Sequence, residues 1–377
     1  MPYAPASLIS PFLPSSYYSD LALMPSGCSR DNASPGSLKQ PVRLRRSIFA
    51  SLTQPVWCVA PFLHNHDGRV ASASDDGHVT VWKSGTRVCH WRNYHEGANT
   101  VIVSPDGTLV VSGGRNGDLQ LWNAASGAHL AGPWKQHNDR VWSVCLSPDG
   151  SRIASCSADG TLVIWDAHSR LPSGRIICGP LQTGHGVVRA IAYCPEGGRV
   201  ATSGHNSTIK IWDDNTGDLQ ATLDTQSETI PSVAWTMDEN IVISGSIDGT
   251  VQAWDISQKT IMWTMRAHKD AIHCIVASDH VFATASADHT ISLWCFKTRH
   301  LLGSSQLPSS ASNDEAHCVV FTADKNTIIT CTKDGKIYTF DIKDIILDVK
   351  AVSRGRMLLW LCCTYVSGRG LPITPAC

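Results

Sequence analysis

One phrase returns seven times along this chain of 377 residues, and it restricts the possible folds more than any other feature of the sequence. The phrase is a run of small residues, an Asp-Gly turn or a variant of it, alternating apolar residues and a closing aromatic residue. The closing residues are Trp82, Trp122, Trp165, Trp212, Trp254, Trp294 and Phe340, at intervals of 40 to 47 residues. A repeat of this length predicts an array of similar small units rather than two or three independent domains.

The third copy indicates what each unit should fold into. Residues 161–165 alternate with period two and are rich in β-branched and aromatic side chains, which is typical of a strand. The preceding Asp159-Gly160 pair predicts a tight hairpin turn, because glycine accepts a positive φ without steric cost. A further strand over residues 141–147 ends at a second turn, so each unit should be an antiparallel sheet of about four strands. One such sheet cannot bury its faces alone, whereas seven arranged radially can.

Two further marks accompany the repeat. The dipeptide Trp-Asp closes three copies, at Trp165, Trp212 and Trp254, and a histidine opens four copies, at His95, His137, His185 and His268. With these motifs, residues 42–350 resemble the WD-repeat (WD40) family. The resemblance implies an all-β fold, a seven-bladed β-propeller of four-stranded antiparallel blades. It says much less about activity, because this fold hosts many unrelated functions.

The two ends of the chain lack the repeat. Residues 1–41 are rich in proline and serine and are expected to be a disordered N-terminal segment, while residues 351–377 are expected to be an irregular C-terminal tail. Two segments compete for the outermost strand of the seventh blade. Residues 43–48 lie as far before Trp57 as an outer strand should, and residues 345–349 follow the last repeat directly. The sequence leaves both options open.

A Ser or Thr, a His and an Asp recur in the units, which invites comparison with a hydrolase triad. The family resemblance instead implies a structural network in which these residues and the Trp lock each blade by hydrogen bonds. Two copies match it fully, with His137, Ser155, Asp159 and Trp165 in the third and His268, Thr284, Asp288 and Trp294 in the sixth. A catalytic triad occurs once, whereas these sets repeat. We therefore expect no catalytic residue, no cofactor-binding residue and no enzyme activity.

Some copies depart from this network. Asn116 and Asn206 replace the turn Asp in the second and fourth copies, and the fifth copy has no His at the position near Thr225. These blades are expected to be less rigidly cross-linked.

Binding is expected on the face where the His loops and the Asp-Gly turns open. The resemblance implies that the first residues of each inner strand line the central mouth there, and three aligned positions per copy give 21 candidates, which include Asp75 and Glu315. The eight that we single out are Trp57, Arg115, Arg140, Trp142, Arg189, His205, His273 and His317. Copies two to four supply the arginines and Trp142, and copies five and six supply almost no charge. This cationic arc predicts capture of a short acidic or phosphorylated peptide, with Trp142 as its apolar anchor.

Composition restricts the kinds of binding partner and the cellular location that we expect for this chain. The 31 Lys and Arg nearly balance the 32 Asp and Glu, which argues against a broadly basic nucleic-acid-binding protein. The 14 cysteines form no C-x-x-C pair and no Cys/His cluster at zinc spacing, so no metal ligand is expected. The chain begins without the regions of a signal peptide, and no apolar run approaches the ~20 residues of a membrane span. We expect an intracellular protein, cytoplasmic or nuclear, that does not insert into membranes.

The function expected from these features is a non-catalytic scaffold that binds other proteins and assembles complexes. One alternative is the regulatory sensor module of a signalling (STAND-type) ATPase, because Gly132-Pro133 and Gly179-Pro180, before His137 and His185, resemble the repeats of such proteins. Another is a ubiquitin-ligase substrate adaptor, although the associated Trp-Asp-x-Arg form is missing after Trp165.

Overall fold

The computed structural model describes residues 41–64, 68–92, 97–169, 171–225, 227, 229–308 and 315–350. The chain divides into two units, residues 1–37 and 38–377, and all described residues belong to the second unit. The expected disordered segment and C-terminal tail therefore fall outside the described residues, apart from residue 41.

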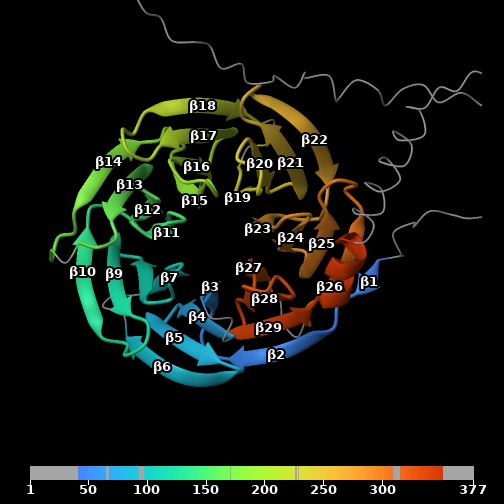
Figure 1. Cartoon of the computed structure of the whole chain (residues 1–377), viewed down its shortest axis with the longest axis horizontal. Coiled ribbons are helices and arrows are strands. Elements are labelled where there is room, and N and C mark those ends of the chain that lie inside the picture. Colours follow the sequence, from blue (N-terminus) through green and yellow to red (C-terminus); the bar gives the residue numbers. More distant parts are fainter. Residues whose placement is uncertain are drawn as a thin grey trace, which may run out of the picture. The chain divides into compact units, whose positions relative to one another are not determined.

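The described residues form seven sheets around a central axis, each with four antiparallel strands, which confirms the predicted seven-bladed β-propeller (Figure 1). Blade one contains β3 (Val56–Pro61), β4 (Arg69–Ser74), β5 (His78–Lys83) and β6 (Thr86–Arg92). Blade two contains β7 (Ala98–Val103), β8 (Leu109–Gly114), β9 (Asp118–Asn123) and β10 (His129–Lys135). Blade three contains β11 (Val141–Leu146), β12 (Arg152–Ser157), β13 (Thr161–Asp166) and β14 (Ile176–Gln182). Blade four contains β15 (Val188–Tyr193), β16 (Arg199–Gly204), β17 (Thr208–Asp213) and β18 (Leu219–Asp224). Blade five contains β19 (Ser232–Trp235), β20 (Ile241–Gly245), β21 (Thr250–Asp255) and β22 (Thr260–Arg266). Blade six contains β23 (Ile272–Ala277), β24 (Val281–Ser286), β25 (Thr290–Cys295) and β26 (Leu301–Gln306), and blade seven contains β27 (Ala316–Phe321), β28 (Thr327–Thr332), β29 (Lys336–Asp341) and β2 (Arg46–Ser51).

Within each blade, the strands run in chain order from the centre to the rim, except where the N-terminal strand completes blade seven (Figure 1). The turn between β12 and β13 shows why the repeat needs its glycine. Gly160 has a φ of 84°, and a Cβ at this position would lie 2.6 Å from the carbonyl oxygen of Gly186. A side chain would therefore suffer both an unfavourable φ and a steric clash.

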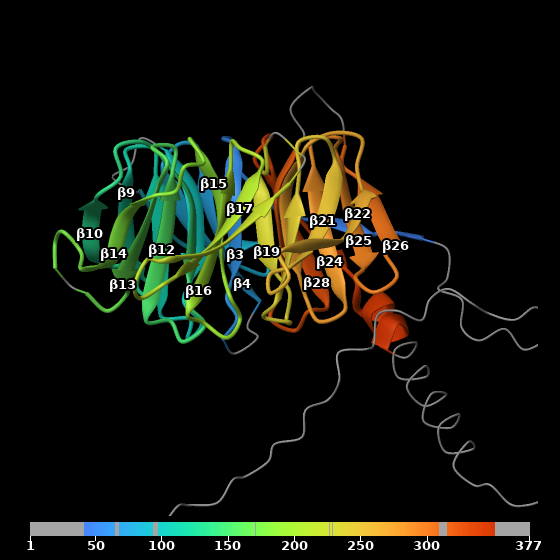
Figure 2. The same cartoon turned by 90° about the horizontal axis from the view of Figure 1, so that it is seen from above.

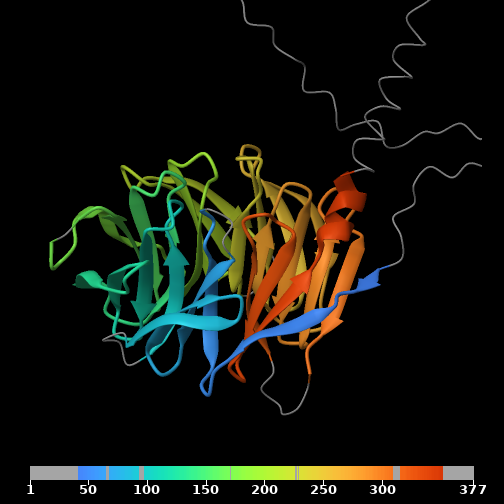
Figure 3. The same cartoon turned by 60° about the horizontal axis from the view of Figure 1, so that its bottom comes forward.

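The N-terminal strand closes the ring. β2 pairs antiparallel with β29, in a register that places Arg46 opposite Phe340 and Ser51 opposite Lys336 (Figure 3). Its Ala50 is buried in the core between blades seven and one. A short strand, β1 (Val42–Arg43), also pairs in parallel with β26 of blade six. Closure covers the edge of β29, which would otherwise be open to pairing with another chain.

The alternative outer strand over residues 345–349 is not formed, because residues 343–350 are helical. The apolar residues Ile342, Ile346 and Val349 lie four and three positions apart, which places them on one side of a helix. All three are buried against blades six and seven, while Leu347 is 55% exposed. Of the described residues, no helix is both long and apolar enough to cross a membrane.

The hydrophobic core lies between neighbouring blades. Seen from the side, the blades stand next to one another around the ring (Figure 2). Between blades two and three, Trp134 stacks on Trp165 with ring centroids 5.5 Å apart, and Leu119, Leu121 and Ile153 are buried around them. Each blade thus buries both faces only because it has a neighbour on each side, and this packing holds the ring in shape.

Candidate partner-binding face

A bulge interrupts the start of inner strands, which stand closest to the central axis (Figure 1). In β3, β11, β15, β23 and β27 the register shifts between the first and third residues. A bulge leaves the residue between them outside the ladder and re-aims its side chain. The residues at this second position are Trp57, Trp142, Arg189, His273 and His317, so five of the eight predicted residues share one backbone device.

The eight residues fall into three groups in the structure. The first is a cationic cluster on blades three and four, made of Arg140, Trp142, Arg189 and His205. The guanidinium carbon of Arg189 lies 4.2 Å from the centre of the Trp142 ring, and that of Arg140 lies 5.3 Å from it. Arg189 also donates from Nε to Nε2 of His205, at 2.9 Å. We call this group the Trp142 cluster.

The Trp142 cluster holds two nearby positive charges. Burial lowers the pKa of Arg189, and the charge of Arg140 lowers it further. Burial also lowers the pKa of His205, with a contribution from Arg189. Within the described part of the chain, Arg189 forms no ion pair, and Arg140 has only an exposed contact of 3.9 Å with Asp139. An exposed ion pair of this kind stabilises little, so the cluster keeps an unneutralised positive field.

The second group is already neutralised. Arg115, in the turn after β8, forms an ion pair with Asp75, the residue after β4. Asp75 Oδ1 also accepts a hydrogen bond of 2.7 Å from Trp57 Nε1. We predicted Arg115 and Trp57 as partner-binding residues of one face, and in the structure Asp75 contacts both of them. Asp75 was among the aligned candidates, but the sequence did not indicate which arginine it would face.

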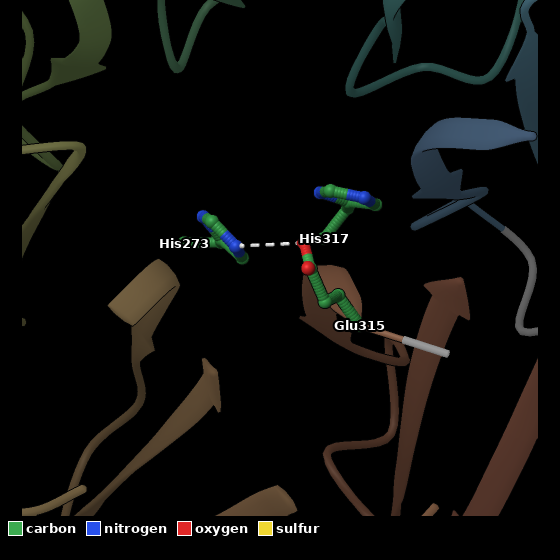
Figure 4. Close-up of side chains that lie close together, drawn as sticks. All are labelled: His273, Glu315 and His317. Atoms are coloured by element: carbon green, nitrogen blue, oxygen red, sulfur yellow. Dashed lines mark ion pairs between the residues drawn. The ribbon is translucent and has the colours of Figure 1, made fainter. Parts of the chain in front are cut away.

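The third group lies on blades six and seven, at the opposite side of the mouth. Nε2 of His273 lies 3.5 Å from Oε2 of Glu315, and the rings of His273 and His317 are 5.1 Å apart (Figure 4). Trp57 packs against His317 at 4.8 Å. Burial lowers the pKa of His273 although Glu315 opposes the shift, and burial, with His273 and Lys333 nearby, lowers the pKa of His317 to about 3. Both imidazoles are therefore neutral at pH 7.

The four network residues of the third copy form one continuous chain of hydrogen bonds. Trp165 Nε1 donates to Ser155 Oγ at 2.9 Å, and Ser155 Oγ lies 2.7 Å from His137 Nε2. His137 Nδ1 lies 2.7 Å from Thr161 Oγ1, which donates to Asp159 at 2.6 Å. Because the Thr161 hydrogen goes to Asp159, His137 Nδ1 must carry the hydrogen that Thr161 accepts, and His137 Nε2 accepts from Ser155.

The sixth copy builds the same chain with a direct carboxylate contact. Trp294 Nε1 donates to Thr284 Oγ1 at 3.0 Å, His268 Nε2 lies 2.7 Å from this oxygen, and His268 Nδ1 lies 3.0 Å from Asp288. Burial raises the pKa of Asp288, but hydrogen bonds from His268 and Thr290 outweigh it, so the pKa is well below its usual range. These side chains satisfy one another inside the blade and point to no open site.

Blade four keeps the chain despite its asparagine. His185 Nδ1 lies 2.6 Å from Asn206 Oδ1, and His185 Nε2 lies 3.0 Å from Thr202 Oγ1, which accepts from Trp212 Nε1 at 2.9 Å. Asn206 also donates to the carbonyl of Gly184. An amide can therefore occupy the place of the turn carboxylate. His95, the corresponding residue of the second copy, lies outside the described residues.

Comparison with protein-family models agrees with this architecture. The model described as WD domain, G-beta repeat matches six segments, residues 44–83, 86–123, 130–166, 178–213, 217–255 and 259–295. The chain belongs to the WD40-repeat family. Each WD40 match begins at or near the outer strand of one blade and ends with the third strand of the next, as residues 86–123 span β6 to β9. The structure adds a seventh blade after the last match.

Several known proteins are similar to parts of this WD40 chain. NACHT domain- and WD repeat-containing protein 1 of Mus musculus is 25% identical over 162 residues, which cover 41% of this chain and 10% of that protein. Small ribosomal subunit protein RACK1 of Caenorhabditis elegans is 43% identical over 70 residues, 18% of this chain and 21% of that protein. Methylosome protein WDR77 of Xenopus laevis is 27% identical over 106 residues, 27% of this chain and 31% of that protein. The matched regions thus span from a tenth to a third of these relatives.

Proposed function

We propose that this chain is a non-catalytic WD40-repeat scaffold that assembles protein complexes, and that the Trp142 cluster captures a short acidic or phosphorylated segment of a partner. The coarser role, binding of other proteins, is supported by the family and by relatives whose names place them in a ribosomal subunit and a methylosome. The finer role is supported by one observation: Arg189 packs on Trp142 beside Arg140, without a carboxylate partner among the described residues.

The chemistry of the cluster favours an anionic ligand. A guanidinium donates two parallel hydrogen bonds to a carboxylate or a phosphate. The indole face holds the Arg189 guanidinium by a cation–π contact, which fixes its orientation before a ligand arrives. An anion between Arg140 and Arg189 would relieve the repulsion that lowers the pKa of Arg189. Trp and Arg are also the residue types that contribute most to interface energies.

A second candidate function is the sensor module of a signalling ATPase. It is favoured by the similarity to a relative whose name pairs WD repeats with a NACHT domain. In that role the propeller would act beside another domain or chain. The same cationic cluster could serve it, so the two functions differ in the identity of the partner rather than in the binding surface.

Peptide binding tests the proposed site. Fluorescence anisotropy would compare a fluorescent peptide library of acidic and phosphorylated sequences with uncharged analogues, for the wild type and for Arg140→Ala plus Arg189→Ala. We expect acidic or phosphorylated peptides to bind the wild type in a salt-dependent manner and to lose at least tenfold in affinity with the double variant.

Arg175→Ala is the matched control, since Arg175 is 72% exposed and pairs with Asp166 at the far end of blade three from Asp159. This control should bind like the wild type. Equal affinity of the wild type and the double variant for every anionic peptide would refute the proposed site.

A further inference from the structure

Two blades bring three metal-ligating side chains together at the central mouth. His273 comes from β23 of blade six, Glu315 directly precedes β27 of blade seven, and His317 is the second residue of β27. One ligand atom from each residue lies within 4.8 Å of the other two, and Figure 4 shows the three side chains converging on one space. The contact between His273 Nε2 and Glu315 Oε2 is already 3.5 Å. We propose that His273, Glu315 and His317 form a binding site for a divalent transition-metal ion of the zinc class.

The distances fit an ion after small side-chain movements. Zinc binds imidazole nitrogen and carboxylate oxygen at about 2.0–2.2 Å in a tetrahedral arrangement, which sets neighbouring ligand atoms roughly 3.3–3.5 Å apart. The pair His273 and Glu315 already has this separation. All three ligand atoms lie within 4.8 Å of one another, so the third would have to move by roughly 1 Å to reach this separation.

Two nitrogen atoms of this group are incompletely satisfied. Nε2 of His317 is buried without a hydrogen-bond partner among the described residues, and Nε2 of His273 is buried with only its 3.5 Å contact to Glu315. A buried polar atom without a partner costs free energy, so such an atom in a folded protein calls for an explanation. A metal ion held by both nitrogens and the Glu315 carboxylate would satisfy them and balance the carboxylate charge.

The donor set selects the kind of ion. Two imidazoles and one carboxylate are typical of zinc sites that keep a fourth position open, and they also bind cobalt, nickel and copper. Calcium and magnesium prefer oxygen ligands alone. The side chains of His273 and Glu315 are 28% and 30% exposed, so the fourth position would be reachable from solvent or by a group of a partner protein.

Cys274 and Cys318 follow the proposed ligands His273 and His317 in the chain, and Cys58 follows Trp57, but these three thiols are engaged elsewhere. Cys274 Sγ donates to the carbonyl of Val319 at 3.5 Å, and Cys58 Sγ donates to that of Val101 at 3.4 Å. Cys318 Sγ lies 3.8 Å from the carbonyl of Val59. Each thiol thus links neighbouring inner strands through a carbonyl oxygen. The two donor types can be told apart by experiment.

The site would act as a clasp between blades six and seven, because its ligands come from both. It shares no residue with the Trp142 cluster of blades three and four, although the positive charge of Arg189 contributes to the lowered pKa of His273. Sequence spacing could not reveal it, since His273 and Glu315 are separated by a full repeat.

The test uses the full-length chain without an affinity tag, treated with a chelator and then titrated with Zn²⁺ in competition with a colorimetric chelator. We expect one strong site per chain, and at least a tenfold loss of affinity with Glu315→Gln and with His317→Ala. His300→Ala is the control, because His300 is exposed and outside the group. At one Zn²⁺ concentration, the Tm of the wild type and of His300→Ala should rise more than the Tm of either ligand variant.

Co²⁺ identifies the donors. The account predicts tetrahedral cobalt d–d bands without a thiolate-to-cobalt charge-transfer band, and the same spectrum for Cys274→Ser. Absence of a stoichiometric site in the wild type would overturn the proposal. So would undiminished affinity in Glu315→Gln, which keeps the shape of the side chain, or a charge-transfer band that disappears in Cys274→Ser.

Discussion

The buried histidine of the third blade should contribute measurably to the stability of the propeller, and Ser155→Ala, compared with a matched variant, tests that contribution. Ser155 is fully buried, and its hydroxyl joins Trp165 Nε1 at 2.9 Å to His137 Nε2 at 2.7 Å. The substitution leaves two buried polar groups without a partner, each at a cost of about 1–3 kcal/mol. We therefore expect Ser155→Ala to lower the free energy of unfolding by about 2–6 kcal/mol.

Blade five offers a matched control. Ser244 occupies the equivalent position and accepts from Trp254 Nε1 at 3.3 Å, but no histidine joins it among the described residues. Trp165 and Trp254 are equally buried, at 1% exposed. Ser244→Ala removes the equivalent hydroxyl but leaves only Trp254 Nε1 without a hydrogen-bond partner, instead of two groups. It should therefore lower the free energy of unfolding by about 1–3 kcal/mol.

Urea unfolding followed by circular dichroism would measure both variants, with an unchanged m-value as the check that the folded and unfolded states are comparable. The account predicts that Ser155→Ala is the more destabilising of the two. Equal losses of stability for Ser155→Ala and Ser244→Ala would refute the claim that the histidine network locks the blade.

Three further predictions follow from the same geometry. Burial opposes ionisation of Asp159 and Asp288, but hydrogen bonds outweigh it and hold the pKa of both carboxyl groups well below the usual range. Their stabilisation is therefore present above the unfolded pKa of about 4 and is lost as the pH falls below it. From pH 5 to pH 2 the wild type should lose more stability than Asp159→Asn plus Asp288→Asn, and parallel plots of stability against pH for the two proteins would contradict this. Hydrogen exchange of the inner strands should be faster in blade five than in blade three, because blade five lacks the His network, and equal protection would disprove it. Deletion of residues 1–51 should open the edge of β29 and lower the Tm more than truncation after Ile342, and the reverse order would show that the helix, not β2, is the clasp.

The architecture could be predicted from the sequence because the same residue pattern occurs seven times along the chain. The turn at Asp159-Gly160, the alternation up to Trp165 and the histidine before them each recur, so an error in one copy is corrected by the others. The helix over residues 343–350 occurs once. Its apolar residues fit a strand over a short window, and only the longer spacing of Ile342, Ile346 and Val349 favours a helix.

The candidate site was only partly predictable. Alignment of the copies indicated that Trp142, Arg189 and His317 share one structural position, and the structure adds the bulge that projects them. Which side chain of a neighbouring blade each of these residues contacts depends on the arrangement of the blades around the ring. Asp75 of blade one forms an ion pair with Arg115 of blade two, and Glu315 of blade seven contacts His273 of blade six. These pairings join residues about one repeat apart, so neither local pattern nor composition could reveal them.

The central claim is that partner proteins bind the WD40 propeller through the Trp142 cluster. Quantitative affinity purification with mass spectrometry tests it most directly, by comparing the wild type, Trp142→Ala plus Arg189→Ala, and the control Arg175→Ala. The account predicts a set of proteins that the wild type and Arg175→Ala retain and the double variant loses. Recovery of the same proteins in the same amounts with all three chains would contradict it.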